Sequence, residues 1–178
     1  LDTIYFGGGT PTTLSDEQLD RVLTKLEQLF DVENTIELTV EAGRPDSITR
    51  EKLKVLKKHN VDRISINPQT MNQKTLDLIG RRHTVEQIKE AFMMAREEGF
   101  DNINMDMILG LPEENVDMVK NTLSQIKELS PESLTVHSLA IKRAAALNVW
   151  RDKYQDLSIE NNSRMVELAA DYAESMNM

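Results

Sequence analysis

The chain has 178 residues, of which 39% are hydrophobic and 29% charged, so it is long enough for one globular domain with a hydrophobic core. Its formal net charge of −9 argues against binding to nucleic acid or to a membrane surface, because both are polyanions. No apolar run approaches the ~18 residues of a membrane span. The sequence has no cysteine, which excludes disulfides and thiolate-bound metals within this chain. We expect a cytoplasmic protein.

Five β-prone runs alternate with segments of helical spacing. The runs cover residues 3–8, 36–42, 63–69, 102–109 and 133–141. Strands that alternate with helices at intervals of roughly 30 residues predict right-handed βαβ units and a parallel sheet, which is the α/β class. Five units are too few to close an eight-stranded barrel. The sheet is therefore either open or part of a barrel whose other strands lie outside this chain.

Three segments between the runs carry apolar residues at helical spacing. These stripes are Leu19, Val22, Leu23, Leu26 and Phe30; Ile88, Ala91, Phe92 and Ala95; and Val116, Val119, Leu123, Ile126 and Leu129. The pairs Ser15 with Gln18 and Thr84 with Gln87 have the spacing of capping boxes, which predicts helix starts there. Residues 142–160 are irregular and charged, and residues 160–178 predict a further helix.

One face of the predicted sheet is polar. In three runs the polar residues alternate with aliphatic ones, namely Glu37, Thr39 and Glu41; Ser65, Asn67 and Gln69; and Asn102, Asn104 and Asp106. Parallel sheets are normally covered on both faces, and each unpaired buried polar group costs about 1–3 kcal/mol. We therefore expect water or a ligand against this face, which would line a cavity in a curved sheet. A one-layer open sheet with a wet polar face is the alternative.

The candidate site lies where the strands end, because ligands of α/β folds bind at the C-terminal ends of strands. The residues at those ends are Gly8, Gly9, Thr10, Glu41, Gln69 and Asp106. The glycine triplet of residues 7–9 suits a ligand that lies against bare backbone, such as the ammonium and carboxylate of an amino acid; a tight turn is the alternative. Arg81, in the loop Gly-Arg-Arg-His, can reach a ligand carboxylate or remain solvated.

Four segments taken together resemble the radical S-adenosylmethionine (SAM) superfamily. They are YFGGGTPT (5–12), ISINPQTMNQKTLDLIGRRHT (64–84), INMDMILGLP (103–112) and LTVHSLAIKR (134–143). More narrowly, they are similar to the oxygen-independent coproporphyrinogen III oxidase group, especially its coproporphyrinogen dehydrogenase branch. The resemblance implies a partial TIM-like (β/α) barrel over residues 1–143, with residues 144–178 as an irregular and helical continuation of the same domain.

The resemblance also implies an activity. Enzymes of this kind bind SAM beside a 4Fe-4S cluster, and an electron from an external donor cleaves SAM to a radical that abstracts hydrogen from a porphyrinogen propionate. The expected reaction is the oxidative decarboxylation of coproporphyrinogen III to protoporphyrinogen IX in haem biosynthesis, with a tetrapyrrole substrate. A haem-binding or haem-transfer protein of the same group is the alternative.

The same resemblance assigns roles to individual residues. It implies that the backbone of Gly8, Gly9 and Thr10 holds the methionine end of SAM. Further SAM contacts fall on Glu41, Gln69, Arg81 and Asp106, and a backbone contact to adenine falls on Ala140. The stretch that begins at Glu41, Glu-Ala-Gly-Arg-Pro-Asp-Ser, departs from the commoner family form Glu-x-Asp-Pro and is compatible with one additional residue.

The cluster ligands are expected outside this chain. The family's three cysteines form a CxxxCxxC loop after the first barrel strand, and this sequence has none. We therefore expect the chain to begin at the second barrel strand of a longer protein and to be inactive alone. A different hypothesis needs no missing segment: a divalent cation held by Glu37, Glu41 and Asp106 in a barrel enzyme.

Overall fold

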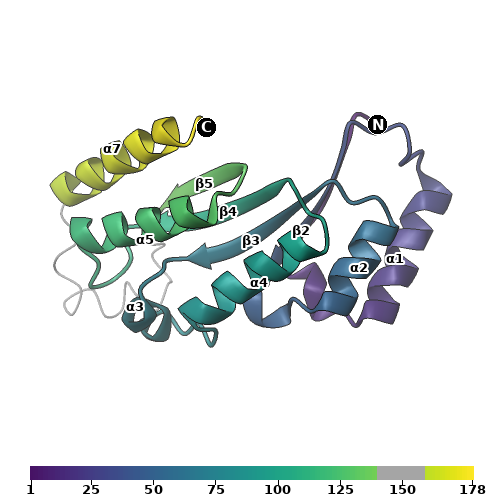
Figure 1. Cartoon of the computed structure of the whole chain (residues 1–178), viewed down its shortest axis with the longest axis horizontal. Coiled ribbons are helices and arrows are strands. Elements are labelled where there is room, and N and C mark those ends of the chain that lie inside the picture. Colours follow the sequence, from purple (N-terminus) through teal and green to yellow (C-terminus); the bar gives the residue numbers. More distant parts are fainter. Residues whose placement is uncertain (140–158) are drawn as a thin grey trace.

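The structure is a computed structural model that describes residues 1–139 and 159–178. Its centre is one parallel sheet of five strands: β1 (Thr3–Phe6), β2 (Glu37–Gly43), β3 (Arg63–Gln69), β4 (Ile103–Leu109) and β5 (Ser133–Ser138). The strands lie in the order in which they occur along the chain, and every neighbouring pair is parallel. They form a half-barrel with helices on its outer side (Figure 1), so the predicted α/β class is confirmed. Ala140 lies outside the described residues.

Within residues 1–139 and 159–178, six α-helices and two short 3₁₀ turns connect or follow the strands. They are η1 (Pro11–Thr13), α1 (Asp16–Leu29), η2 (Pro45–Ser47), α2 (Arg50–Lys58), α3 (Gln73–Leu78), α4 (Val85–Glu97), α5 (Val116–Leu129) and α7 (Ile159–Ser175). Both predicted capping boxes are present, since Ser15 caps α1 with Gln18 and Thr84 caps α4 with Gln87. The helix predicted for residues 160–178 is also confirmed.

The hydrophobic core lies between the helices and the outer face of the sheet. The inward residues of α1, α2, α4 and α5 form one buried cluster with the aliphatic residues of β2, β3 and β4. The predicted stripe of α1 is wider than its buried face, because Leu19 and Leu23 are buried whereas Val22 and Phe30 are exposed. Helix α1 lies at the end of the helical layer (Figure 1), where less of a helix surface is covered.

The opposite, concave face of the sheet is polar, as the alternation predicts. Its residues Thr39, Ser65 and Asn104 are nevertheless buried. These groups donate and accept hydrogen bonds among themselves and with neighbouring side chains, so they do not depend on water or a ligand as the sequence suggested.

Two strands lose their regular pairing near their C-terminal ends. The register shifts between Glu41 and Gly43 in β2 and between Ile66 and Gln69 in β3. Gln69 has a φ of +67°, which is uncommon for a residue with a side chain. Simple alternation therefore does not assign Gln69 to the face of Ser65.

Among the residues that the structure describes, no helix is long and apolar enough to cross a membrane.

Candidate functional site

The glycine loop after β1 combines close packing with open backbone. A Cβ on Gly7 would lie 2.3 Å from Cε1 of Tyr5 and 2.7 Å from Oε2 of Glu41, so a larger residue here would displace these two side chains. Gly8 has a φ of +97°, and a Cβ on Gly8 or Gly9 would meet nothing within 4 Å. The peptide groups of Gly8 and Gly9 are therefore open to the approach of a ligand.

Glu41, near the C-terminal end of β2, reaches the glycine loop. Its Oε2 accepts hydrogen bonds from the Gly8 amide at 3.3 Å and the Tyr5 hydroxyl at 3.4 Å, and its Oε1 accepts from Asn67 Nδ2 at 3.4 Å. All three contacts are long, and no described lysine or arginine pairs with Glu41. The carboxylate thus keeps capacity for a cationic or hydroxyl donor.

Tyr5 stays a hydrogen-bond donor to this carboxylate. Partial burial and the nearby charges of Glu41 and Asp106 raise the pKa of the Tyr5 phenol. The hydroxyl is therefore protonated at neutral pH.

Thr10, at the other end of the loop, lies against the end of β2: its Cγ2 is 3.2 Å from the position of a Cβ on Gly43.

Asp106, in β4, is linked to Glu41 through two residues of β3. Its Oδ1 accepts from Asn104 Nδ2 and lies 3.3 Å from Ser65 Oγ. Ser65 Oγ also lies 3.1 Å from Oδ1 of Asn67, the residue that donates to Glu41. The serine proton serves one acceptor at a time. The two carboxylates therefore belong to one chain of polar contacts that crosses β2, β3 and β4.

Among the described residues, no hydrogen bond or ion pair joins the side chains of Gln69 and Arg81 to this chain of contacts. Gln69 is buried at the end of β3. Arg81 lies between α3 and α4, where its amide donates to the carbonyl of Leu76 at 2.9 Å. Its guanidinium makes no hydrogen bond or ion pair with the described part of the chain, so its five donors are available. The structure thus links Gly8, Glu41 and Asp106 through hydrogen bonds and packs Thr10 against Gly43 at the end of β2. Gln69 and Arg81 lie at the ends of neighbouring segments.

The sequence did not single out the residues that anchor the loop. Thr12 Oγ1 donates to the Ala42 carbonyl at 2.7 Å and lies 2.6 Å from Ser47 Oγ, and Lys52 Nζ donates to the Thr12 carbonyl at 2.6 Å. These contacts tie η1 to the end of β2 and to η2. They join residues 30–40 positions apart, and no local pattern of the sequence marks them. Asn67 could have been found, because alternation places it on the polar face.

His83 is a buried group with no role in this arrangement. Neither of its ring nitrogens has a hydrogen-bond partner among the described residues. Burial lowers the pKa of the His83 imidazole, so the ring is neutral at pH 7.

The divalent-cation hypothesis is wrong for the described residues, which contain no group of three or more carboxylates or imidazoles placed to hold a metal ion. Glu37 lies four positions before Glu41 on the same strand, so the two are ~13 Å apart along β2. Its carboxylate instead accepts from Thr39 Oγ1 at 2.7 Å and faces Arg63 Nη1 at 3.9 Å.

Comparison with known proteins shows the family of this chain. The family model of the radical SAM superfamily matches residues 1–126. The chain belongs to this superfamily. It is 50% identical over 168 residues to the oxygen-independent coproporphyrinogen-III oxidase-like protein HemZ of Bacillus subtilis (strain 168). The aligned region covers 94% of this chain and 34% of HemZ. It is 40% identical over 142 residues to the heme chaperone HemW of Lactococcus lactis, covering 80% and 37%.

A solved structure confirms the partial barrel. The radical SAM enzyme HemN of Escherichia coli, a coproporphyrinogen III oxidase, superposes with a TM-score of 0.85 and 26% identity over 99% of this chain and 41% of HemN. The resemblance inferred from the sequence is therefore confirmed at the level of the superfamily and the fold. The chain spans about a third of the length of each of these two curated relatives.

The superfamily implies SAM and a 4Fe-4S cluster, and the residues of this chain fit the first of these. The open backbone of Gly8 and Gly9 suits the amino-acid end of SAM, and Glu41 and Asp106 keep acceptor capacity for its donors. A 4Fe-4S cluster needs thiolate ligands, and this chain has no cysteine to supply them.

Proposed function

We propose that the protein containing this chain is a SAM-dependent oxidoreductase that converts coproporphyrinogen III to protoporphyrinogen IX without oxygen. The observation that carries the proposal is the chain of contacts from the open glycine loop through Glu41 to Asp106. It supports a ligand with several donors at the C-terminal edge of the sheet. The identity of 50% with HemZ and the superposition on HemN favour a tetrapyrrole substrate.

Each candidate residue has a role in this proposal. The peptide groups of Gly8, Gly9 and Thr10 would hold the ammonium and carboxylate of SAM, and Arg81 would supply a guanidinium for a carboxylate of the ligand. Glu41, Gln69 and Asp106 accept from or donate to the remaining polar groups of SAM, and the backbone of Ala140 contacts adenine. Bound beside the cluster, SAM supplies the hydrogen-abstracting chemistry of the superfamily.

The reaction requires partners that this chain does not provide. Each propionate that becomes a vinyl group loses one hydrogen atom, one electron and CO₂. An external donor supplies the electron that cleaves SAM, and an acceptor takes the electron that leaves the substrate. The cluster ligands come from the rest of the protein, so the chain alone is inactive in this proposal. The proposal keeps the cytoplasmic location expected from the sequence.

The test uses the full-length protein, reconstituted anaerobically with iron and sulfide and supplied with SAM, a reductant and coproporphyrinogen III. We expect protoporphyrinogen IX, CO₂ and 5′-deoxyadenosine. Glu41→Gln and Asp106→Asn should each weaken SAM binding at least tenfold, because a hydrogen bond to a charged group contributes about 1.5–3 kcal/mol. Bound SAM without any decarboxylation would overturn the enzymatic function.

A second function is favoured by the 40% identity with the heme chaperone HemW. In that case the protein binds haem and passes it to an acceptor. Incubation of the haem-loaded protein with a haem-free acceptor, followed by the absorbance of the acceptor, distinguishes the two. Haem transfer without vinyl formation would favour the chaperone, and vinyl formation without transfer the oxidase.

A further inference from the structure

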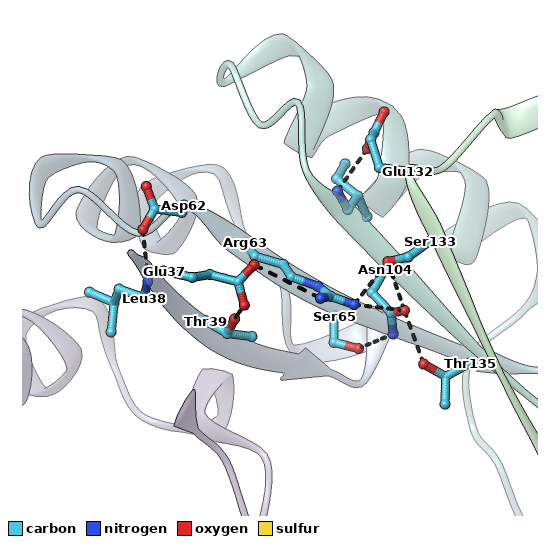
Figure 2. A network of polar contacts seen from close by, with 11 residues as sticks. Glu37, Leu38, Thr39, Asp62, Arg63, Ser65, Asn104, Glu132, Ser133 and Thr135 are labelled. Atoms are coloured by element: carbon cyan, nitrogen blue, oxygen red, sulfur yellow. Dashed lines mark hydrogen bonds and ion pairs between the residues drawn. The ribbon is translucent and has the colours of Figure 1, made fainter. Parts of the chain in front are cut away.

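Asn104 lies at the centre of a polar network on the concave face of the sheet (Figure 2). The residue is 4% exposed. Its side-chain oxygen accepts hydrogen bonds from Arg63 Nη2 at 3.2 Å, Ser133 Oγ at 3.0 Å and Thr135 Oγ1 at 3.0 Å. An amide oxygen has two lone pairs, so these donors from β3 and β5 saturate it.

Arg63 determines which way this amide points. A hydroxyl can turn to donate or to accept, but a guanidinium only donates. If the amide of Asn104 were reversed, its NH₂ group would face the guanidinium and its oxygen would face the carboxylate of Asp106. Glu37 faces Arg63 from the opposite side, with Oε2 3.9 Å from Nη1, and Ser133 Oγ accepts from Nη2 at 2.9 Å. The guanidinium is thus held in place, and it holds the amide.

The nitrogen of Asn104 is consequently directed at the candidate site. Asn104 and Asp106 are two positions apart on β4, so both side chains lie on the concave face. Nδ2 donates to Asp106 Oδ1 and to Ser65 Oγ, the latter at 2.9 Å. Ser65 Oγ is itself 3.3 Å from Asp106 Oδ1. Both neighbours of Asp106 therefore contact the same carboxylate oxygen, and no described residue donates to Oδ2.

We propose that Asn104 is a positioning residue for SAM. Arg63 orients the Asn104 amide, which holds Oδ1 of Asp106 by a hydrogen bond on the concave face. Oδ2 is then left to accept from a hydroxyl or ammonium donor of the ligand. This inference rests on the proposed function, because it takes Asp106 to contact SAM.

The test is Asn104→Asp in the full-length, reconstituted protein. The new side chain has the same shape and still accepts from Arg63, Ser133 and Thr135, but it presents a carboxylate oxygen to Asp106 in place of a donor. The readout is the dissociation constant of S-adenosylhomocysteine, a non-reacting analogue, measured by calorimetry. We expect binding to weaken at least tenfold. Unchanged affinity would overturn the inference.

A double-mutant cycle separates positioning from general stability. In the Asp106→Asn background, Asn104→Asp again places a donor opposite an acceptor. The amide now lies at position 106 and the carboxylate at position 104. The effect of Asn104→Asp on affinity should therefore shrink to about twofold or less. A tenfold effect in both backgrounds would show that Asn104 acts independently of Asp106, which overturns the inference. If Asn104→Asp does not fold, Arg63→Met serves instead, with an expected loss of threefold or more that also disappears beside Asp106→Asn.

Asn34→Asp is the matched control. Asn34 Nδ2 donates to both carboxylate oxygens of Asp31, at 2.9 and 2.8 Å. This pair lies in the loop before β2, away from the C-terminal ends of the strands. The same substitution there should leave affinity within twofold. If the unaltered protein binds no analogue, the proposed function and this inference fail together. If it binds, and Asp106→Asn weakens binding while Asn104→Asp does not, only this inference fails.

Discussion

The three consecutive glycines after β1 differ in the constraint that acts on each of them. Gly7 avoids the ring of Tyr5 and the carboxylate of Glu41. Gly8 adopts a φ of +97°, which a side chain would disfavour. Gly9 has neither constraint, since a Cβ there would meet no protein atom within 4 Å. The absence of any steric reason within the protein makes Gly9 the position most informative about a ligand.

Gly9→Ala should therefore separate folding from binding. We expect its unfolding midpoint to match that of the unaltered protein, while its affinity for SAM falls, because the added methyl occupies space that the ligand needs. Gly8→Ala is the comparison: positive φ should cost it about 1–2 kcal/mol of stability. Calorimetry and urea unfolding measure the two quantities. Full SAM affinity in Gly9→Ala would mean that the ligand does not approach this backbone.

Glu114 is a partly buried carboxylate that joins the segments after β3 and β4. Its Oε1 accepts from Thr70 Oγ1 at 2.5 Å and from Asn72 Nδ2 at 2.9 Å. Burial raises the pKa of the Glu114 carboxyl, and the hydrogen bonds from Thr70 and Asn72 only partly oppose this. The folded state therefore binds this proton more tightly than the unfolded state does.

That difference predicts how Glu114→Gln depends on pH. Since the folded-state pKa lies above the unfolded one, Glu114 favours folding most below the unfolded pKa, and the contribution falls as pH rises through the folded pKa. The glutamine keeps an oxygen for both donors and has no charge to bury. We expect the variant to gain stability relative to the unaltered protein between pH 4 and pH 8 in urea unfolding. Glu113→Gln, at an exposed neighbour, is the control; a flat difference for both would contradict the prediction.

At the scale of elements, capping chemistry was readable from the sequence. Thr84 Oγ1 accepts from the Gln87 amide at 3.2 Å, and Gln87 Oε1 accepts from the Thr84 amide at 2.8 Å. Thr84→Ala should destabilise the protein by about 1 kcal/mol and speed hydrogen exchange in the first turn of α4. Thr84→Ser keeps the hydroxyl and should stay near the original stability. Equal losses in both variants would show that the cap bond is not the cause.

Other elements were beyond local patterns. Helix α2 buries only Leu53 and Leu56 among nine residues, and α3 has only six residues. Neither helix is long enough to repeat the helical period several times, so no stripe of apolar residues predicts them from the sequence. The five strands were found because β-branched alternation recurs, with ends displaced by up to three residues, as in β1 and β5.

The candidate site shows the same division. Alternation alone assigned Glu41 and Asp106 to the polar face, and the structure joins them through Ser65 and Asn67. Asp106 lies in the middle of β4, however, and not at its end as the sequence suggested. Gln69 could not be placed, because the irregular backbone after Ile66 breaks the period of two. The orientation of the Asn104 amide depends on donors from β3 and β5. Side-chain contacts between three strands cannot be predicted from the local pattern of a single sequence.

For the whole molecule, the half-barrel has two outer strands, β1 and β5. In the part of the chain that the structure describes, β1 pairs only with β2, and its Tyr5 is 65% exposed. An unpaired strand edge is a template for association with another chain. The 178-residue chain, produced by itself, is therefore expected to self-associate.

Thr3→Lys tests this expectation, because a charge on an outer strand opposes edge pairing. In sedimentation velocity the variant should shift from dimers or larger species toward the monomer. Gln28→Lys adds the same charge on the exposed surface of α1 and should leave the distribution unchanged. If both lysines act alike, net charge and not the strand edge controls the association.

The irregular pairing between Glu41 and Gly43 has a consequence for recognising proteins of this kind. Gly43 takes a φ of +57°, and the strand there accommodates a residue that its partner does not match. Chain length can thus vary at this point while the carboxylate before it and η2 after it keep their places. A sequence pattern for such proteins should therefore allow a variable number of residues between this carboxylate and the 3₁₀ turn that follows it.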